Sequence, residues 1–260
     1  MQEIEKTLAD FINICAASLG IAEEMLAEPT VEGVAAVEST AAMESGAVLP
    51  LAYLIAEDAE VYADTAHSAI SAISACTACR LCETRTLVVP GEGVENPLVM
   101  IIGEGPGADE DRTGRPFVGR AGQLLDKMIA SIGLSREKNC FIANVVKCRP
   151  PGNRNPSQDE IDACFPYLQK QIVMLQPKII LCAGKISAQR LFDSSLGINA
   201  IRGSFSEYDT GIDGSAAIPL LATYHPSAVL RDESLKRPAW EDLKLLRSKL
   251  EEMGLGIGLL

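Results

Sequence analysis

Four apolar runs recur along the last two thirds of the chain, each followed by a stretch with helical spacing. The runs are Leu98–Ile102, Cys140–Val146, Lys178–Gly184 and Ile218–Tyr224. The helical stretches are Arg120–Ile132, a helix that begins at the capping box Ser157 to Glu160, Lys185–Phe192, and Arg237–Met253, which is expected to turn Trp240, Leu243, Leu246 and Leu250 inward. Strands that alternate with helices indicate a parallel sheet with helices on both faces.

The first 75 residues follow a different pattern. Helical spacing over residues 1–28 gives way to a stretch rich in Ala, Glu, Gly and Ser over residues 29–50. Residues 1–75 carry 13 acidic residues and one lysine, whereas residues 76–260 carry 22 acidic and 22 basic residues. We therefore expect an acidic extension over residues 1–71, partly helical or flexible, and a folded domain over residues 72–260. The extension is either a segment that binds a protein partner or a tail with no role of its own, which is the simpler alternative.

Composition narrows the class of protein. The chain has 260 residues, 47% of them apolar, so a sizeable core is possible. It has no apolar run of eighteen residues and no basic stretch followed by an apolar one at its start, so we expect no membrane span and no signal peptide. We expect a cytoplasmic protein, whose eight cysteines are metal ligands or free thiols rather than disulfides.

A glycine-rich turn, Gly103-Glu104-Gly105-Pro106-Gly107, ends the first apolar run. Ligands of open α/β sheets bind at the carboxyl ends of the strands, where this turn is expected. The spacing matches neither G-x-G-x-x-G nor a P-loop, so a nucleotide-binding turn is not supported. A tight turn without a ligand role remains the simpler alternative, although Glu104 and the following Gly-Arg-Pro-Phe segment favour a site.

Five of the eight cysteines form a metal-ligand pattern, whereas Cys15, Cys140 and Cys182 lie in apolar runs and are expected to be buried thiols. Cys76, Cys79 and Cys82 are spaced C-x2-C-x2-C, and Cys148 and Cys164 lie further along the chain. Thiolates two apart in a turn can converge on a metal that a second pair completes. A redox dithiol and the start of a ferredoxin-type run remain open alternatives.

Two polar residues end other predicted strands. Asn144 interrupts an apolar run and His225 follows the last strand, so both should share the sheet edge with Glu104. Each has a structural alternative, since a lone Asn or His is more often satisfied within the core. Three basic segments, at residues 112–120, 147–154 and 231–237, fall on the same edge and favour a track for a polyanion.

Residues from about 72 to 254 resemble the family 4 uracil-DNA glycosylases, the iron–sulfur type first known from thermophiles. The resemblance rests on Cys76, Cys79, Leu81 and Arg85 at their spacing, on residues 103–126 and 144–156, on Cys164, and on residues 225–231. Gly105 departs from the family, which usually has Ala there. The resemblance implies a three-layer α/β/α sandwich with a four-stranded parallel sheet. It also implies a DNA repair enzyme that flips deoxyuridine out of DNA and hydrolyses the N-glycosidic bond, releasing uracil.

The same resemblance implies roles for individual residues. Gly103, Glu104, Gly105, Pro106 and Gly107 would close over the uracil, Phe117 would stack on it, and Asn144 would read O4 and N3–H. The expected catalytic residues are His225, which would donate a hydrogen bond to uracil O2, and Glu104, which would position or activate the water. A [4Fe–4S] cluster would sit on Cys76, Cys79, Cys148 and Cys164, leaving Cys82 as a non-ligand.

DNA contacts follow from the same motifs and from the basic loops. We expect Arg115, Arg149, Arg154 and Arg231 to bind DNA, Ser227 to touch a phosphate, and Val229 or Leu230 to wedge into the gap left by the flipped base. The loop between Cys148 and Cys164 holds no His, so the covalent product adduct of a related iron–sulfur branch is not expected.

Two other function classes remain as alternatives. A non-enzymatic iron–sulfur or zinc protein that binds nucleic acid would keep the cysteines and basic loops without needing Glu104, Asn144 and His225 together. An electron carrier would require Cys82 as a ligand and would dispense with Cys164. We expect a monomer, because nothing in residues 76–260 demands a dimer.

Overall fold

The computed structural model describes residues 73–212 and 215–255. The predicted acidic extension, residues 1–71, lies outside the described residues. Its expected helices and protein partner therefore stay predictions. No helix in the described part is long and apolar enough to cross a membrane.

One mixed sheet forms the centre of the domain, with the strand order β1-β3-β2-β4-β6-β5. The strands are β1 (Glu92–Gly93), β2 (Val99–Gly103), β3 (Cys140–Asn144), β4 (Ile179–Ala183), β5 (Ser206–Tyr208) and β6 (Ile218–Thr223). The four inner strands run parallel, and β1 and β5 pair antiparallel at the two edges. The predicted four-stranded parallel sheet is confirmed as the centre of this sheet. The edge strands were missed because two or three residues give no periodic signal.

Helices connect the strands and cover both faces. They are α4 (Ala108–Thr113), α5 (Arg120–Ala130), α6 (Gln158–Leu175), α7 (Lys185–Leu191), α8 (Ile198–Ile201), α9 (Pro226–Arg231) and α10 (Lys236–Glu252), with 3-10 turns η3 (Arg80–Glu83), η4 (Pro151–Asn153) and η5 (Glu233–Leu235). The capping box that begins α6 is confirmed, since Ser157 N donates to Glu160 Oε2 at 2.9 Å.

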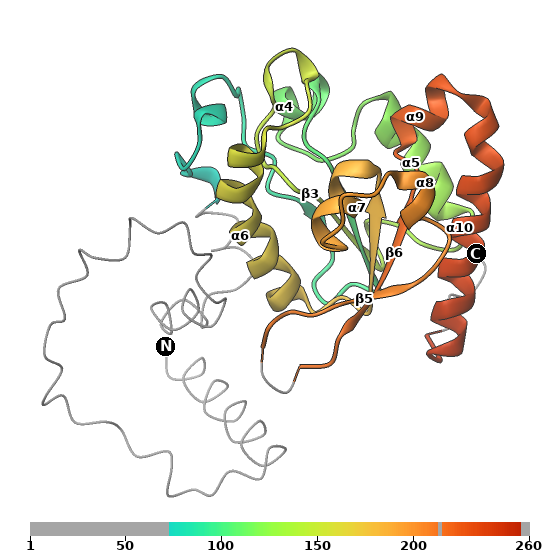
Figure 1. The fold of residues 1–260 in the computed structure, drawn as a ribbon. Coiled ribbons are helices and arrows are strands. Elements are labelled where there is room, and N and C mark those ends of the chain that lie inside the picture. The colour runs from blue at the N-terminus through green and yellow to red at the C-terminus, as the bar shows by residue number, and fades with distance from the viewer. Residues whose placement is uncertain (1–72, 213–214, 256–260) are drawn as a thin grey trace, which may run out of the picture. The chain divides into compact units, whose positions relative to one another are not determined.

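Alternating residues of each strand supply two cores. Met100 and Ile102 share one core with residues of α6 and α7, while Val99 and Ile101 share the other with residues of α5 and α10. Figure 1 shows α6 on one side of the sheet and α5 and α10 on the other. The three-layer α/β/α architecture is confirmed, and it leaves the strand ends free for loops.

One inward residue was predicted wrongly. Leu243, Leu246 and Leu250 of α10 are buried, but Trp240 is 41% exposed, and Ala239 occupies the buried position beside it. The helix begins one residue earlier than predicted, and its buried stripe passes through the small residue. Hydrophobicity alone could not choose between the two neighbours.

Candidate active site

An open cleft of about 490 Å³ lies at the carboxyl ends of the parallel strands. Its lining includes Glu104, Gly105, Pro106, Gly107, Phe117, Asn144, Arg154, Lys185, Tyr224, His225, Ser227 and Arg231. Helices α4 and α9, which follow β2 and β6, mark this end of the domain at the top of Figure 1. In the sheet, β3 lies on one side of β2 and β4 lies on the other, so the order of the strands reverses at β2. Ligands of open α/β sheets bind at such a reversal. The structure therefore brings the predicted uracil-binding residues together.

Gly103 forms the floor on which two of these side chains meet. It pairs with Asn144 across β2 and β3, which fixes the depth of both residues. A Cβ at Gly103 would collide with Asn144 Oδ1 and with the Phe117 ring. A glycine is thus required here so that the amide and the aromatic ring can approach the same point.

The Asn144 side chain is buried but incompletely bonded. Its exposed fraction is 2%, and Oδ1 has no hydrogen-bond partner among the described residues. A buried acceptor without a partner is costly, so it marks a place where a ligand donor fits. An amide can accept from a ring N–H and donate to an adjacent carbonyl, which is the pattern of the uracil edge.

Glu110 ties the glycine-rich turn to the loop that carries Phe117. Its Oε2 accepts from Gly107 N at 3.1 Å, and its Oε1 accepts from Val118 N and Gly119 N, both at 2.9 Å. One carboxylate therefore satisfies three backbone donors and fixes two walls of the cleft relative to each other.

Arg136 holds the same loop from the other side. Its guanidinium is buried and donates to Pro116 O and Phe117 O, each at 3.0 Å, and pairs with Asp126 at 2.7 Å. Phe117 itself has φ +51°, a strained backbone conformation for a bulky residue. The two carbonyl contacts stabilise this conformation, which places the Phe117 ring 5.6 Å from the His225 ring.

His225 is held in one neutral tautomer. Its Nδ1 accepts from the backbone N–H of Ser227 at 3.1 Å and contacts Ser227 Oγ at 2.8 Å, so the ring proton lies on Nε2. The pKa of His225 is lowered to about 4, mainly by burial and also by the charge of Arg231, while Glu110 acts in the opposite direction. Nε2–H of a neutral imidazole is therefore available as a hydrogen-bond donor in the cleft.

Glu104 is the ionisable acid on the turn. Burial raises its pKa, and among the described residues no hydrogen bond or ion pair holds its carboxylate. A carboxylate that lacks partners and is partly desolvated is a stronger base than one in water. This arrangement suits a group that accepts a proton from water.

The predicted DNA-binding cations fall into two groups. Arg154 is paired with Glu160 at 2.6 Å and Arg115 with Glu92 at 2.6 Å, so acidic partners already neutralise both. Arg149 donates to the neutral Asn153, and Arg231 has no acidic partner among the described residues.

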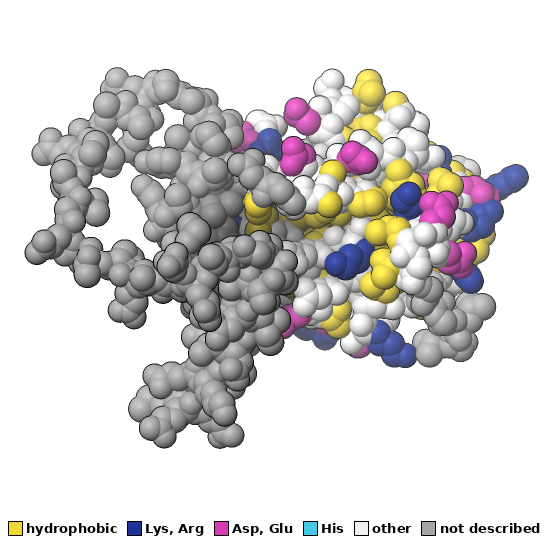
Figure 2. Space-filling view, turned by 90° about the horizontal axis from the view of Figure 1, so that it is seen from below, with side chains coloured by type: hydrophobic (Ala, Val, Ile, Leu, Met, Phe, Trp, Pro, Cys, Tyr) yellow, Lys and Arg dark blue, Asp and Glu magenta, His cyan; other side chains and the backbone are white. Residues whose placement is uncertain are grey.

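The opposite end of the described part, seen in Figure 2, has Lys and Arg interspersed with Asp and Glu.

The two wedge candidates are distinguished by burial. Val229 is 2% exposed and packs inward, whereas its neighbour Leu230 is 42% exposed. A side chain that enters a base stack must be exposed. Burial therefore argues against the predicted DNA contact of Val229, and Leu230 stays the predicted wedge.

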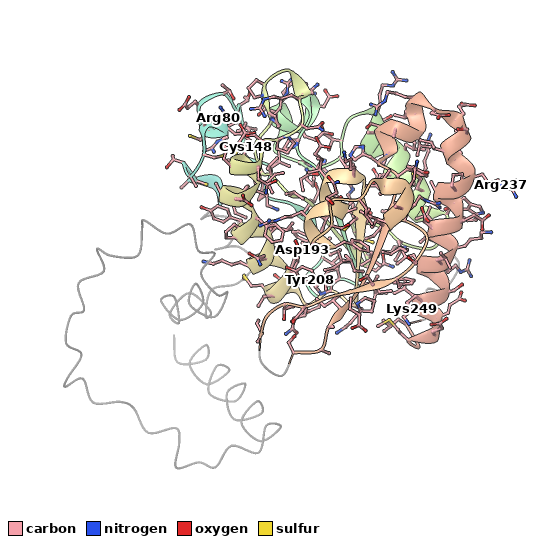
Figure 3. The ribbon with its side chains drawn as sticks, viewed as in Figure 1. Arg80, Cys148, Asp193, Tyr208, Arg237 and Lys249 are labelled. Carbon is pink, nitrogen blue, oxygen red and sulfur yellow. The ribbon has the colours of Figure 1, made fainter. Side chains whose placement is uncertain are left out.

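A second cavity lies beside the first and is lined by cysteines. Cys76, Cys79, Cys82, Cys148 and Cys164 all face it. Cys148 and Arg80 lie at the same corner of the domain in Figure 3. The described residues contain no group of three ligands arranged for a single metal ion. A cluster of several irons is larger than one ion, so its ligands are spaced more widely.

The donor set around this cavity fits an iron–sulfur cluster. Ala78 N lies 3.4 Å from Cys76 Sγ, Lys147 N lies 3.2 Å from Cys164 Sγ, and Arg85 Nη1 lies 3.2 Å from Cys148 Sγ. Such N–H contacts stabilise thiolates, which is the form that binds iron. Cys140 and Cys182 are buried in the cores, as predicted for plain thiols.

Sequence reasoning missed the supporting charged residues. Glu110 and Arg136 act on backbone groups, and Lys147 and Glu160 are buried. Only the capping box gave a signal for Glu160. The others lack a motif, because their partners are backbone groups and side chains distant in the sequence, which only the fold brings close.

Comparisons with known proteins agree with this geometry. The family described as the Uracil DNA glycosylase superfamily matches residues 90–244. The type-4 uracil-DNA glycosylase of Sulfurisphaera tokodaii is 46% identical over 172 residues, which cover 63% of this chain and 74% of the relative. The type-4 enzyme of Thermotoga maritima is 40% identical over 65% of this chain and 86% of its own length. A type-5 uracil-DNA glycosylase of Mycobacterium leprae is 31% identical over 54% of this chain and 67% of its own length. The chain belongs to the uracil-DNA glycosylase superfamily, and within it to the type-4 family.

Proposed function

We propose that this protein removes uracil from DNA by hydrolysing the N-glycosidic bond of a flipped deoxyuridine. The observation that carries the proposal is the buried Asn144 amide, which lies beside Phe117 in the cleft and whose acceptor oxygen has no partner in the described part of the chain. Membership of the family supports it. So does the convergence of Glu104 and His225 on the same cleft.

Asn144, His225 and Glu104 each have a role in that reaction. Asn144 accepts N3–H and donates to O4, while Phe117 stacks on the ring. Bond cleavage leaves negative charge on the departing uracil, and His225 Nε2–H stabilises that charge at O2. Because the imidazole is neutral, it donates a hydrogen bond to O2 without itself carrying a positive charge.

Glu104 acts on the water. As the glycosidic bond breaks, positive charge develops on the sugar, and water attacks C1′. The Glu104 carboxylate orients that water and takes its proton, and its raised pKa suits it to this task. The bond to the base breaks, an oxygen from water is added to the sugar, and uracil leaves with an abasic site behind.

We also propose that Cys76, Cys79, Cys148 and Cys164 would hold a [4Fe–4S] cluster. When bound, the cluster supplies a cross-link between η3, the loop after β3 and α6. Replacing Cys164 with Ala should abolish the brown colour and the visible absorbance, whereas Cys82→Ala should keep both. Loss of colour in Cys82→Ala with retention in Cys164→Ala would favour the electron-carrier alternative.

The remaining predictions concern partners and location. Uracil-containing DNA is the proposed partner, bound along Arg149, Ser227, Leu230 and Arg231. A protein partner for residues 1–71, a monomeric state and a cytoplasmic location stay predictions. Size-exclusion chromatography with light scattering tests the monomer directly.

A labelled duplex with one uracil tests the proposed function. The duplex is incubated with the protein, the abasic site is cleaved by alkali, and released uracil is measured in parallel. Cleavage at the uracil, and none at a matched thymine, is expected. DNA binding without uracil release by folded, coloured protein would instead support the non-enzymatic binding protein.

A further inference from the structure

Lys147 is a buried cation that the reaction does not use. Its exposed fraction is 1%, and no acidic side chain pairs with it in the described residues. Burying a charge without a counter-ion is costly, so its hydrogen bonds must offset the loss of water. Those bonds lead directly to the candidate active site.

The Lys147 ammonium caps the strand that carries Asn144. Nζ donates to the Asn144 carbonyl oxygen at 3.0 Å and to Gln171 Oε1 at 2.6 Å. Asn144 is the last residue of β3, and the two residues after it still donate backbone bonds to Gly103 O at 3.0 Å and Glu104 O at 3.1 Å. Gln171 is fixed in turn, because its Nε2 donates to Pro90 O at 2.8 Å.

The backbone of Lys147 is held as firmly as its side chain. Its N–H points to Cys164 Sγ at 3.2 Å, and its carbonyl accepts from Val89 N at 2.8 Å. The next residue is Cys148 of the cysteine cavity. Lys147 thus connects the cysteine cavity and α6 to the residue that faces the base.

We propose that Lys147 is a positioning residue for base recognition, which fixes the Asn144 backbone so that its amide meets the uracil edge. Within residues 73–212 and 215–255, Asn144 Oδ1 accepts no hydrogen bond, so the orientation of this side chain depends on the backbone that carries it. Peptide geometry couples the carbonyl and the side chain of one residue, and a small rotation misdirects both amide contacts. This inference rests on the proposed function.

A double-mutant cycle tests it. Lys147→Met keeps the length and apolar stem but removes the donor, and single-turnover excision with excess enzyme is measured in the wild-type and Asn144→Ala backgrounds. Lys147→Met should slow excision by about ten- to a hundredfold in the first background, the usual effect of losing a bond to a charged donor. It should change the rate by less than about twofold in the second, because the residue through which it acts is gone.

Arg136→Met is the matched control. It also removes a buried cation from backbone carbonyls, but these belong to Pro116 and Phe117. It should slow excision in both backgrounds. Equal slowing by Lys147→Met in both backgrounds would overturn the inference, since that result shows a general effect on the fold.

A second variant covers failure of Lys147→Met to fold, judged by circular dichroism and visible absorbance. Gln171→Met removes one acceptor of the ammonium and leaves the Asn144 contact. A smaller slowing that disappears in Asn144→Ala supports the inference, and slowing that persists contradicts it. Absence of uracil release by the wild type would refute the proposed function instead, so the two failures are distinguishable.

Discussion

Glu104 and Glu160 are two desolvated glutamates with opposite surroundings. Glu160 accepts from Arg154 and Arg80 and from Ser157 N, and the bond from Arg154 is the main cause of its lowered pKa. Glu104 has no such partner among the described residues, and burial raises its pKa. The opposite pKa shifts distinguish a structural glutamate, whose hydrogen bonds are all made within the protein, from a glutamate in a cleft whose polar groups can still bind a ligand.

The same contrast extends to neighbouring side chains. Asn144 Oδ1 and His225 Nε2 in the cleft have no partner among the described residues, and we call them the open group. Arg154, in the loop beside the cleft, is paired with Glu160, and we call this pair the closed group. Residue type therefore does not separate function from support here. Unmet hydrogen-bonding capacity does, and the following changes test that distinction.

The largest effect is expected in the open group. Asn144→Ala and His225→Ala should each lower the single-turnover excision rate by about 10²- to 10³-fold, the usual effect of removing one preorganised contact to developing charge. The melting temperature of Asn144→Ala should stay close to that of the wild type, because Asn144 Oδ1 has no hydrogen-bond partner among the described residues. His225→Ala should melt lower, because it also loses the contacts of Nδ1 with Ser227 that cap α9. A rate within threefold of the wild type would contradict the assigned roles.

The closed group should show the reverse pattern. Glu160→Gln removes the charge partner of Arg154 and the nearer of the two acidic partners of Arg80. Thermal unfolding should therefore shift down by roughly 5 °C at pH 7. Excision measured well below this transition should change little. Glu160→Asp, which keeps the charge, should shift the transition less.

The Glu160 deficit should also depend on pH in a stated direction. Because the pKa of Glu160 is lowered on folding from 4.5, its stabilisation is complete above that value and is lost as the pH falls towards the folded pKa. The difference between wild type and Glu160→Gln should therefore narrow in acid. A constant difference down to the acid transition would contradict this pairing.

Glu104 should set the acid limb of activity. The carboxylate must be ionised to accept the proton of water, and burial raises its pKa, so excision should fall as the pH drops through a value above 4.5. His225, with a pKa of about 4, stays neutral over most of this window. The Glu104→Gln variant should excise uracil slowly, and its rate should not fall in acid as that of the wild type does. A profile of the excision rate from pH 4.5 to 8 measures both.

The smallest effects concern the cations. Arg231→Ala should weaken DNA binding several-fold and reduce the slope of log affinity against log salt by about one unit. Arg115→Ala should have less effect on both, because Glu92 already neutralises Arg115. Fluorescence anisotropy with an abasic duplex at several salt concentrations measures the pair. A larger effect of Arg115→Ala would show that DNA displaces Glu92.

The sequence predicted the inner strands and the helices α5, α6, α7 and α10, because apolar periodicity and the capping box are local signals. It did not predict the short helices α4, α8 and α9. It also predicted that Glu104, Asn144 and His225 share one edge, since each ends a parallel strand. It could not predict that Trp240 is exposed or that Val229 is buried, because both depend on which helix stripe meets the sheet. Lys147 was predicted to lie in a basic segment that faces a polyanion, and this was wrong, because it is buried. No signal in the sequence indicated a role for Arg136, whose partners only the fold brings near.

One measurement tests the central claim most directly: single-turnover uracil excision by wild type, Asn144→Ala and Glu160→Gln, with the melting temperature of each recorded. The account predicts that Asn144→Ala loses the rate and keeps the melting temperature, while Glu160→Gln keeps the rate and loses stability. Comparable losses of rate in both variants, or no uracil release by the wild type, would contradict it.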